Sequence, residues 1–168
     1  SQFLDETMTY SAAYFCHPDE PLECAQRNKL RMLINKAQIE SHHHVLEIGS
    51  GWGSFAIEAV KLTGCRVTTI TISQAQYRLA KERIDEAGLA DRIDIQLCDY
   101  RQFTGQFDRI VSIEMIEAVG HEYLPEYFKT VDRLLKPDGL FVLQAITIAD
   151  QEYDRYRKDY DWIRKHIF

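Results

Sequence analysis

Three glycines at every second position follow a short apolar run. The run covers residues 45–48 and leads into Gly49, Gly51 and Gly53. Glycines in such a turn let the backbone bend sharply and let a ligand approach the main chain closely. Because position 54 is serine, the spacing is G-x-G-x-G, and the dinucleotide pattern G-x-G-x-x-G is not met. The loop predicts a binding turn, with a turn that has no ligand as the alternative.

Polar side chains follow each of the next three apolar runs. They are Thr71, Ser73 and Gln76 after the second run, Asp99 and Tyr100 after the third, and Glu114 and Glu117 after the fourth. If the runs are parallel strands, these residues share one edge of the sheet, where ligands of such folds bind. A nicotinamide enzyme usually carries an acid after the second strand to hold ribose hydroxyls. This chain has Thr71, Ile72 and Ser73 there, which disfavours a dehydrogenase.

The elements that must position these residues alternate along the chain. Strands are predicted at residues 45–48, 66–72, 93–97, 107–113 and 140–148. Helices are predicted at residues 20–39, 55–62, 73–87 and 124–135, with a charged helix at the C-terminal end. Lys136-Pro137-Asp138-Gly139 is expected to stop the fourth helix. The alternation predicts an α/β domain over residues 1–168, in which a parallel sheet has helices on both faces.

Composition excludes several classes of function. The net charge of −6 gives no bulk attraction to nucleic acid or to an anionic surface. The basic clusters at residues 27–36 and 155–166 are best interpreted as solvated helix faces. No apolar run is long enough to predict a membrane span, and no signal-peptide pattern begins the sequence. The sequence indicates no oligomeric state.

The cysteines and histidines do not predict a metal site. Because no C-x-x-C pair occurs, we expect reduced, mostly buried thiols in a cytosolic protein; the four cysteines are Cys16, Cys24, Cys65 and Cys98. His42, His43 and His44 are adjacent, and neighbouring side chains in an extended segment point in alternating directions. We therefore expect no metal ion at the histidine run.

Several short blocks, in the same order, resemble the cyclopropane fatty acid synthase family, which includes the mycolic acid cyclopropane synthases. The first block is Met8-Thr9-Tyr10-Ser11-Ala12-Ala13-Tyr14-Phe15, and the others lie at residues 45–55, 71–76, 106–112, 115–120 and 161–168. The resemblance implies a Rossmann-like class I methyltransferase fold that binds S-adenosylmethionine (SAM). It further implies transfer of a methylene or methyl group to the double bond of an unsaturated acyl chain in a phospholipid, in the cytoplasm and at the inner membrane surface.

The same resemblance assigns the cofactor residues. Tyr10 and Ser11 would contact the methionine part of SAM, and residues 46–54, with Glu47, Gly49, Gly51 and Gly53, would line it. Thr71 and Gln76 would reach the ribose. Tyr100 and Arg101 would flank the adenine, beside Asp99. Small hydroxyls and backbone amides suit a zwitterionic amino acid, and an aromatic face suits adenine.

Structural alternatives stay open for three of these residues. Gln76 lies three residues after Ser73 and could simply close a capping box. Asp99 could only cap a turn, and Tyr100 could only pack in the core.

The chemistry of the family points to a base. Alkylation of a double bond leaves a carbocation, and a bound bicarbonate ion would remove a proton from it. The anchor of that ion matches Glu117, in an apolar setting. Two positions depart from the family: Ala12 replaces a cysteine, and Gln144 replaces a histidine. Gln144 can donate a hydrogen bond to an anion but cannot carry a proton, so we expect an altered ion site.

Only a short charged stretch follows residue 148, which is too little for the two further strands of a complete methyltransferase sheet. We therefore expect a piece of a longer chain, truncated after the fifth strand. Three alternatives stay open: a methyltransferase for small molecules, a SAM-binding core that is inactive on its own, and a regulatory module that binds NAD or ATP.

Overall fold

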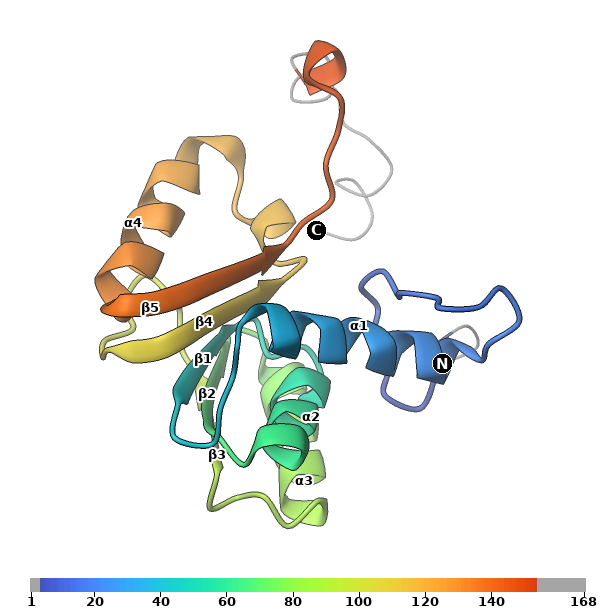
Figure 1. The fold of residues 1–168 in the computed structure, drawn as a ribbon. Helices are drawn as coiled ribbons and strands as arrows, with labels where there is room; N and C mark the ends of the chain where they lie inside the picture. The colour runs from blue at the N-terminus through green and yellow to red at the C-terminus, as the bar shows by residue number, and fades with distance from the viewer. Residues whose placement is uncertain (1–3, 154–168) are drawn as a thin grey trace.

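In the computed structural model, which describes residues 4–153, the strands form one parallel sheet in the order β3-β2-β1-β4-β5 (Figure 1). The strands are β1 (His44–Ile48), β2 (Arg66–Thr71), β3 (Ile93–Leu97), β4 (Phe107–Ile113) and β5 (Leu135–Gln144). The direction of winding reverses between β1 and β4, and ligands of such sheets bind beyond the carboxyl ends of the strands at this point. The last block of the resemblance and the expected C-terminal helix lie outside the described residues.

Helices cover both faces of the sheet, as predicted. Figure 1 shows α1 (Leu22–Lys36), α2 (Ser54–Thr63) and α3 (Gln74–Glu86) on one side and α4 (Leu124–Leu134) on the other. Two short 3-10 turns, η1 (Ile116–Ala118) and η2 (His121–Tyr123), connect β4 to α4. The fold is therefore that of an open α/β sheet with a switch point between β1 and β4.

The two core layers follow from the alternation of side chains along β1. Val45 packs with Phe55 and other residues of α1, α2 and α3 on one face. Leu46 and Ile48 pack with Tyr127 and other residues of α4 on the opposite face. Because successive side chains of a strand point to opposite faces, a nearly all-apolar strand must be buried on both. This burial fixes β1 in the sheet and holds the glycine loop that follows it.

The fifth strand begins earlier and ends earlier than the sequence predicts. Leu135 already pairs with Phe107, and the register then shifts so that Leu140 pairs with Arg109. The stretch 136–139, expected as a helix stop, therefore lies in an irregular part of β5, where a strand tolerates proline. The strand ends at Gln144, which pairs with Ile113. Gln144 thus lies at the carboxyl edge of the sheet beside the end of β4.

The thiols are free, but they are less buried than expected. Cys65 is buried and Cys98 half-buried, whereas Cys16 and Cys24 are exposed, so the prediction of mostly buried thiols is wrong. Cys16 is exposed because it lies in the polar segment before α1, although cysteine is usually a buried residue type.

Two of the adjacent histidines have protein partners. His43 Nδ1 accepts a hydrogen bond from the backbone of Glu40, and the ring of His44 is hydrogen-bonded to Thr68. Within residues 4–153, no group of three or more His, Cys, Asp or Glu side chains could hold a metal ion. No helix in the same range is both long and apolar enough to cross a membrane.

Candidate functional site

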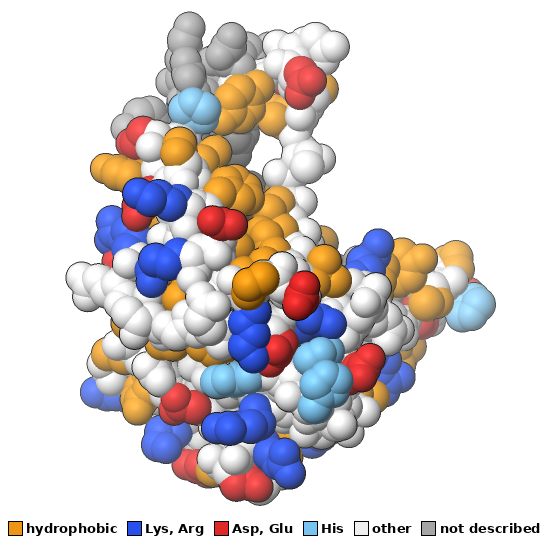
Figure 2. Space-filling view, turned by 60° about the vertical axis from the view of Figure 1, so that its left-hand side comes forward, with side chains coloured by type: hydrophobic (Ala, Val, Ile, Leu, Met, Phe, Trp, Pro, Cys, Tyr) orange, Lys and Arg blue, Asp and Glu red, His pale blue; other side chains and the backbone are white. Residues whose placement is uncertain are grey.

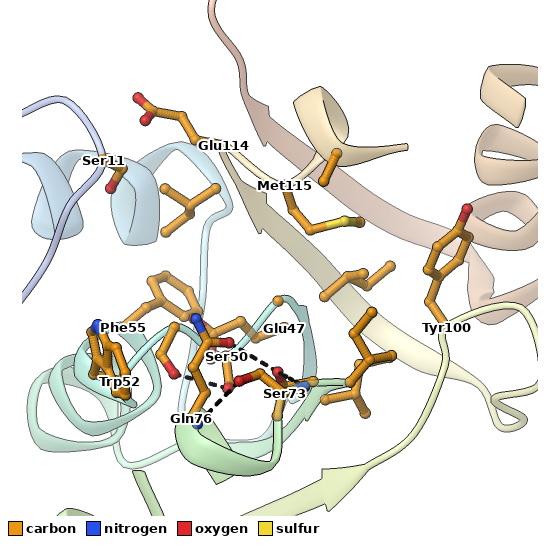
Figure 3. A pocket seen from close by; sticks show the side chains of 18 of the residues that line it. Ser11, Glu47, Ser50, Trp52, Phe55, Ser73, Gln76, Tyr100, Glu114 and Met115 are labelled. Atoms are coloured by element: carbon orange, nitrogen blue, oxygen red, sulfur yellow. Dashed lines mark hydrogen bonds between the residues drawn. The ribbon is translucent and has the colours of Figure 1, made fainter. Parts of the chain in front are cut away.

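A cavity of about 430 Å³ lies at the carboxyl ends of the strands, next to the switch point. Its walls come from the N-terminal segment, α1, the glycine loop and the ends of β2, β3 and β4. Figure 3 shows Ser73 and Gln76 on one side, Glu114 and Met115 on the other, and Trp52 and Tyr100 toward opposite ends. The volume falls in the range of sites for small molecules, about 300–1,000 Å³.

The glycine loop uses its three glycines in two ways. All three have positive φ angles, +94° at Gly49, +47° at Gly51 and +86° at Gly53. A Cβ at Gly49 would lie 3.0 Å from Cγ of Met115, and one at Gly53 would lie 3.2 Å from Cβ of Ala80. Nothing lies within 4 Å of a Cβ at Gly51, which lines the cavity. Gly49 and Gly53 therefore permit close packing, whereas Gly51 leaves open space that a ligand can fill.

Glu47 is a buried acid beneath this loop. Its Oε2 accepts a hydrogen bond of 2.6 Å from Thr69 Oγ1, and the residue lines the cavity. Burial raises the pKa of Glu47 to about 8, against the opposing effects of Thr69 and Lys29. At neutral pH Glu47 is therefore largely protonated and presents a hydrogen-bonding group without a charge.

Lys29 is a functional candidate that the sequence analysis missed. It is only 2% exposed, although it lies in the basic stretch of α1 that was interpreted as a solvated face. Its ammonium donates a hydrogen bond of 2.6 Å to Ser11 Oγ, and both residues line the cavity. Burial lowers the pKa of Lys29 to about 8, while Glu114 and Glu47 favour the charged form. A mostly charged lysine thus lies beside Ser11, at the end of the cavity where the methionine part of SAM was predicted to bind.

Gln76 points into the cavity and does not close a capping box. Ser73 Oγ accepts a hydrogen bond from the Gln76 backbone, which is the first half of such a box. The second half is absent, because the Ser73 backbone donates to Thr71 Oγ1. The side chain of Gln76 accepts from Thr71 Oγ1 at 2.9 Å and donates to the phenol of Tyr10 at 3.2 Å. The structure therefore brings together Tyr10, Thr71 and Gln76, as predicted for a shared site.

Asp99, Tyr100 and Arg101 line the far end of the cavity. Asp99 accepts a hydrogen bond of 2.9 Å from the Arg101 backbone and forms an ion pair with its guanidinium. The hydrogen bonds from Arg101 hold the pKa of Asp99 below its usual value. The ring of Tyr100 packs edge-on against Tyr127 at 5.5 Å. Both structural alternatives hold, since Asp99 caps its own turn and Tyr100 packs, while both residues also face the cavity.

Ile72 completes this end and was not predicted as a site residue. It lines the cavity and keeps 77% of its surface exposed, which is unusual for a side chain that directly follows a buried strand. An exposed aliphatic group and an aromatic ring that line the same cavity suit a flat, apolar ligand group. The signal in the sequence was an apolar residue between Thr71 and Ser73.

The two residues that were predicted to be catalytic have different hydrogen-bond partners. Glu117 lies in η1, and its Oε1 accepts a hydrogen bond of 2.6 Å from the backbone of Ile146. Its Oε2 is buried and has no hydrogen-bond partner among residues 4–153. Gln144 instead donates to Glu114 Oε1 at 2.7 Å and to the carbonyl oxygen of Ala12 at 3.5 Å. Both hydrogens of the Gln144 amide are thus engaged away from Glu117.

Glu114 links three segments at the rim of the cavity. Besides Gln144, its Oε1 accepts a hydrogen bond of 2.9 Å from the Ala12 backbone. Its own backbone donates to the carbonyl oxygen of Gln144 at 2.8 Å. The φ angle of Glu114 is +46°, a left-handed conformation that non-glycine residues seldom adopt and that is often found at functional sites. The sequence placed Glu114 after β4 but gave no sign of this conformation.

Together these groups suit one kind of ligand. One end offers a lysine, a neutral acid and a hydroxyl, which fit a zwitterionic amino acid. The other end offers an aromatic ring and an aliphatic side chain, which fit an adenine, and the Thr71–Gln76 pair between them offers polar groups for a ribose. The open space at Gly51 lets such a ligand lie against the main chain.

The chain also matches known proteins along its whole length. The family model described as mycolic acid cyclopropane synthetase matches residues 1–168. The chain is 43% identical over 99% of its length to the tuberculostearic acid methyltransferase UfaA1 of Mycobacterium tuberculosis, covering 40% of that protein. It is 42% identical over its whole length to the cyclopropane-fatty-acyl-phospholipid synthase of Escherichia coli, covering 42% of that protein.

A solved structure shares the fold. The mycolic acid cyclopropane synthase CmaA1, complexed with SAH and CTAB, aligns with a TM-score of 0.85 at 32% identity. The alignment covers 93% of this chain and 55% of that one. The chain thus spans about two fifths of the length of the sequence relatives it matches.

Proposed function

The chain belongs to the mycolic acid cyclopropane synthetase family, and on this premise we propose that the full-length protein alkylates an unsaturated acyl chain of a lipid with SAM as donor. SAM supplies an electrophilic methyl group. The residues of this chain bind the donor, exclude water and manage the proton that the reaction releases. The observation that carries the proposal is the cavity at the switch point, with open space at Gly51 between a polar and an apolar end.

The donor site consists of residues from five segments. Lys29 and Ser11 hold a carboxylate, and Glu47, protonated at neutral pH, adds a hydrogen bond without repelling it. Thr71 and Gln76 bind ribose hydroxyls. The side chains of Ile72 and Tyr100 enclose the adenine, and Tyr10, Gly49, Gly51, Asp99 and Arg101 complete the site. Gly53 lies outside the cavity lining and supports the loop by packing against Ala80.

Apolar side chains around the cavity mouth support a lipid acceptor. Tyr10 is 58% exposed, Tyr123 is 52% exposed and both line the cavity, while Ile146, just past β5, is 65% exposed. Figure 2, with the α4 and β5 side turned forward, shows hydrophobic side chains gathered in a band above a lower surface of mixed charge. Because the net charge is −6, contact with a membrane would rest on such apolar groups, at the inner surface in the cytoplasm.

An alkene is a weak nucleophile, so most of the rate must come from holding it close to the donor in a dry site. Positioning of this kind supplies about 7–11 kcal/mol in favourable cases. The new carbon–carbon bond leaves a positive charge on the neighbouring acyl carbon, and a base must then take a proton. A bicarbonate ion held by Glu117 and Gln144 is one proposed base. In this structure Gln144 already uses both amide hydrogens on Glu114 and Ala12.

Two measurements on the full-length protein test the proposal. Titration calorimetry should give heat with SAM and with its demethylated product, and little with NAD or ATP. Vesicles of a monounsaturated phospholipid should gain one methylene unit per acyl chain with SAM, whereas vesicles of the matched saturated lipid should not. Binding of NAD in preference to SAM would identify a nucleotide module. Binding of SAM with no change in either lipid would point to a small-molecule acceptor.

A further inference from the structure

Resting on the proposed function, we propose that Glu114 is the base that takes the proton from the alkylated acyl chain, in place of a bound ion. The two positions that depart from the family, Ala12 through its backbone and Gln144 through its side-chain amide, both donate a hydrogen bond to Glu114 Oε1. The carboxylate of this side chain therefore stands where an external anion would otherwise be held.

The carboxylate is fixed on one side and open on the other. Oε1 has donors at 2.9 Å and 2.7 Å, whereas no described residue donates a hydrogen bond to Oε2. Glu114 lines the cavity together with Met115, and Figure 3 shows both on the wall opposite Ser73 and Gln76. Holding one oxygen orients the side chain and leaves the other free to accept a proton.

The backbone supports the same conclusion. A glutamate at φ +46° carries a conformational cost that surrounding contacts must offset. The hydrogen bond from its backbone to the Gln144 carbonyl oxygen, 2.8 Å, helps to hold this conformation. A left-handed residue directly after β4 turns its side chain out of the alternation of the strand and toward the N-terminal segment.

The charges around Glu114 suit a cationic transition state. The buried ammonium of Lys29 interacts with Glu114 through space. A carboxylate at this position stabilises the positive charge that develops on the acyl carbon. The base need not be strong, because a C–H bond beside a carbocation is far more acidic than a carboxylic acid.

Each bond that forms in the proposed step is matched by a bond that breaks. A carbon–carbon bond forms between the acyl chain and the transferred methyl group, and the carbon–sulfur bond to the donor breaks, with its electron pair leaving on sulfur. Glu114 then accepts a proton from the new methyl group, and the C–H electron pair closes the ring. If the proton comes from an adjacent acyl carbon instead, the electron pair forms a double bond and the product is a methyl-branched alkene. No oxidant or reductant is needed.

In this scheme Gln144 is a positioning residue. Its amide cannot carry a proton, but it orients the carboxylate of Glu114. The backbone amide of Ala12 does the same, and this hydrogen bond does not depend on the side chain at position 12.

The test compares Glu114→Gln and Glu114→Gly in the full-length protein, with the exposed Glu82→Gln on α3 as control. Glutamine keeps the shape and accepts the same hydrogen bonds, and glycine suits the positive φ and empties the space. We expect Glu114→Gln to bind SAM within about threefold of the unaltered protein while turnover falls by about 10²-fold or more. Glu114→Gly should lose a similar factor in turnover, and its turnover should rise at least about tenfold when formate or bicarbonate is added. The control should match the unaltered protein.

Three results would overturn the inference. Added bicarbonate could be required by the unaltered protein, Glu114→Gln could keep full turnover, or Glu114→Gln could lose SAM affinity as much as rate. Failure of the proposed function gives a different result, since the unaltered protein would then modify no lipid at all, and the inference would fall with it.

Discussion

The side-chain amide of Gln76 donates a hydrogen bond of 3.2 Å to the phenol oxygen of Tyr10, joining α3 to the N-terminal segment across the cavity. The same segment is held from α1, because Lys29 donates to Ser11 Oγ and Gln26 donates to the Ser11 carbonyl oxygen. Residues around Tyr10 thus form one wall of the cavity, although they are remote from the glycine loop in sequence.

Tyr10→Phe should weaken SAM binding without unfolding the protein. It removes only the hydroxyl that Gln76 contacts, and one hydrogen bond contributes about 0.5–1.5 kcal/mol, so a loss of about two- to tenfold in affinity is expected. Calorimetry measures it. Tyr14→Phe is the matched control, since Tyr14 is exposed and does not line the cavity. Equal behaviour of the two variants would remove Tyr10 from the donor site.

Gly51→Val should abolish the stabilisation that SAM provides. In the unaltered protein, SAM at about 100 times its dissociation constant should add about 2.7 kcal/mol to the free energy of unfolding. The valine side chain would fill the open space at Gly51. Gly88→Val is the control, because Gly88 also has a positive φ and nothing within 4 Å of a Cβ, yet lies outside the cavity. Both variants should cost stability, and a SAM response that survives in Gly51→Val would contradict the site.

Glu47 should make stability fall as pH rises toward 8. Its folded pKa is raised to about 8, so the folded protein keeps a proton that the unfolded chain has lost above its ordinary pKa. Stability therefore declines between about pH 5 and about pH 8, by at most about 1.4 kcal/mol per pH unit. Lys29, with its pKa lowered to about 8, adds the opposite slope above that pH. Denaturant unfolding of Glu47→Gln should show a shallower decline up to pH 8, and an unchanged slope would mean that Glu47 is ionised in the fold.

Glu117→Gln should lower turnover and leave SAM affinity nearly unchanged. Glu117 lies outside the cavity lining, but Met115 and Ala118, its near neighbours in sequence, are part of it. If Glu117 and Glu114 act as one unit, each single variant should lose about 10²-fold in turnover, and the double variant should lose little more. Single-turnover rates and calorimetry separate the effects, with exposed Glu122→Gln as control. Parallel losses of affinity and rate would make Glu117 a structural residue.

Patterns local in sequence predicted most of the fold. The strands from β1 to β4, the helices and the glycine loop follow from periodicity, caps and turn residues. The boundaries of β5 do not, because they depend on its pairing with β4, including the register shift near Arg109. The helix α4 does end just before Pro137 and Gly139, as predicted, but these two residues also lie in an irregular part of β5.

The sequence predicted the positions of those site residues whose type and local spacing are distinctive. Tyr10, Thr71 and Gln76 do meet, and the glycines do form the loop. Lys29 was missed, and Glu114 was placed at the ligand-binding edge without a role, because the roles of both depend on distant partners. Lys29 is buried against Ser11, 18 positions away, and Glu114 is bonded to Gln144, 30 positions away, through a backbone conformation that no local pattern encodes.

Transfer of a deuterated methyl group tests the central claim most directly. The full-length protein is mixed with SAM that carries a trideuterated methyl group and with a monounsaturated phospholipid, and the acyl chains are analysed by mass spectrometry. We predict that the acyl chain gains one carbon from the donor. Where Glu114 takes the proton from the transferred methyl group, that carbon keeps all but one of the deuterium atoms of the methyl group. Retention of all the deuterium would indicate a methyl-branched alkene and still support transfer to the lipid. Acyl chains without deuterium, from a protein that binds SAM, would contradict the account.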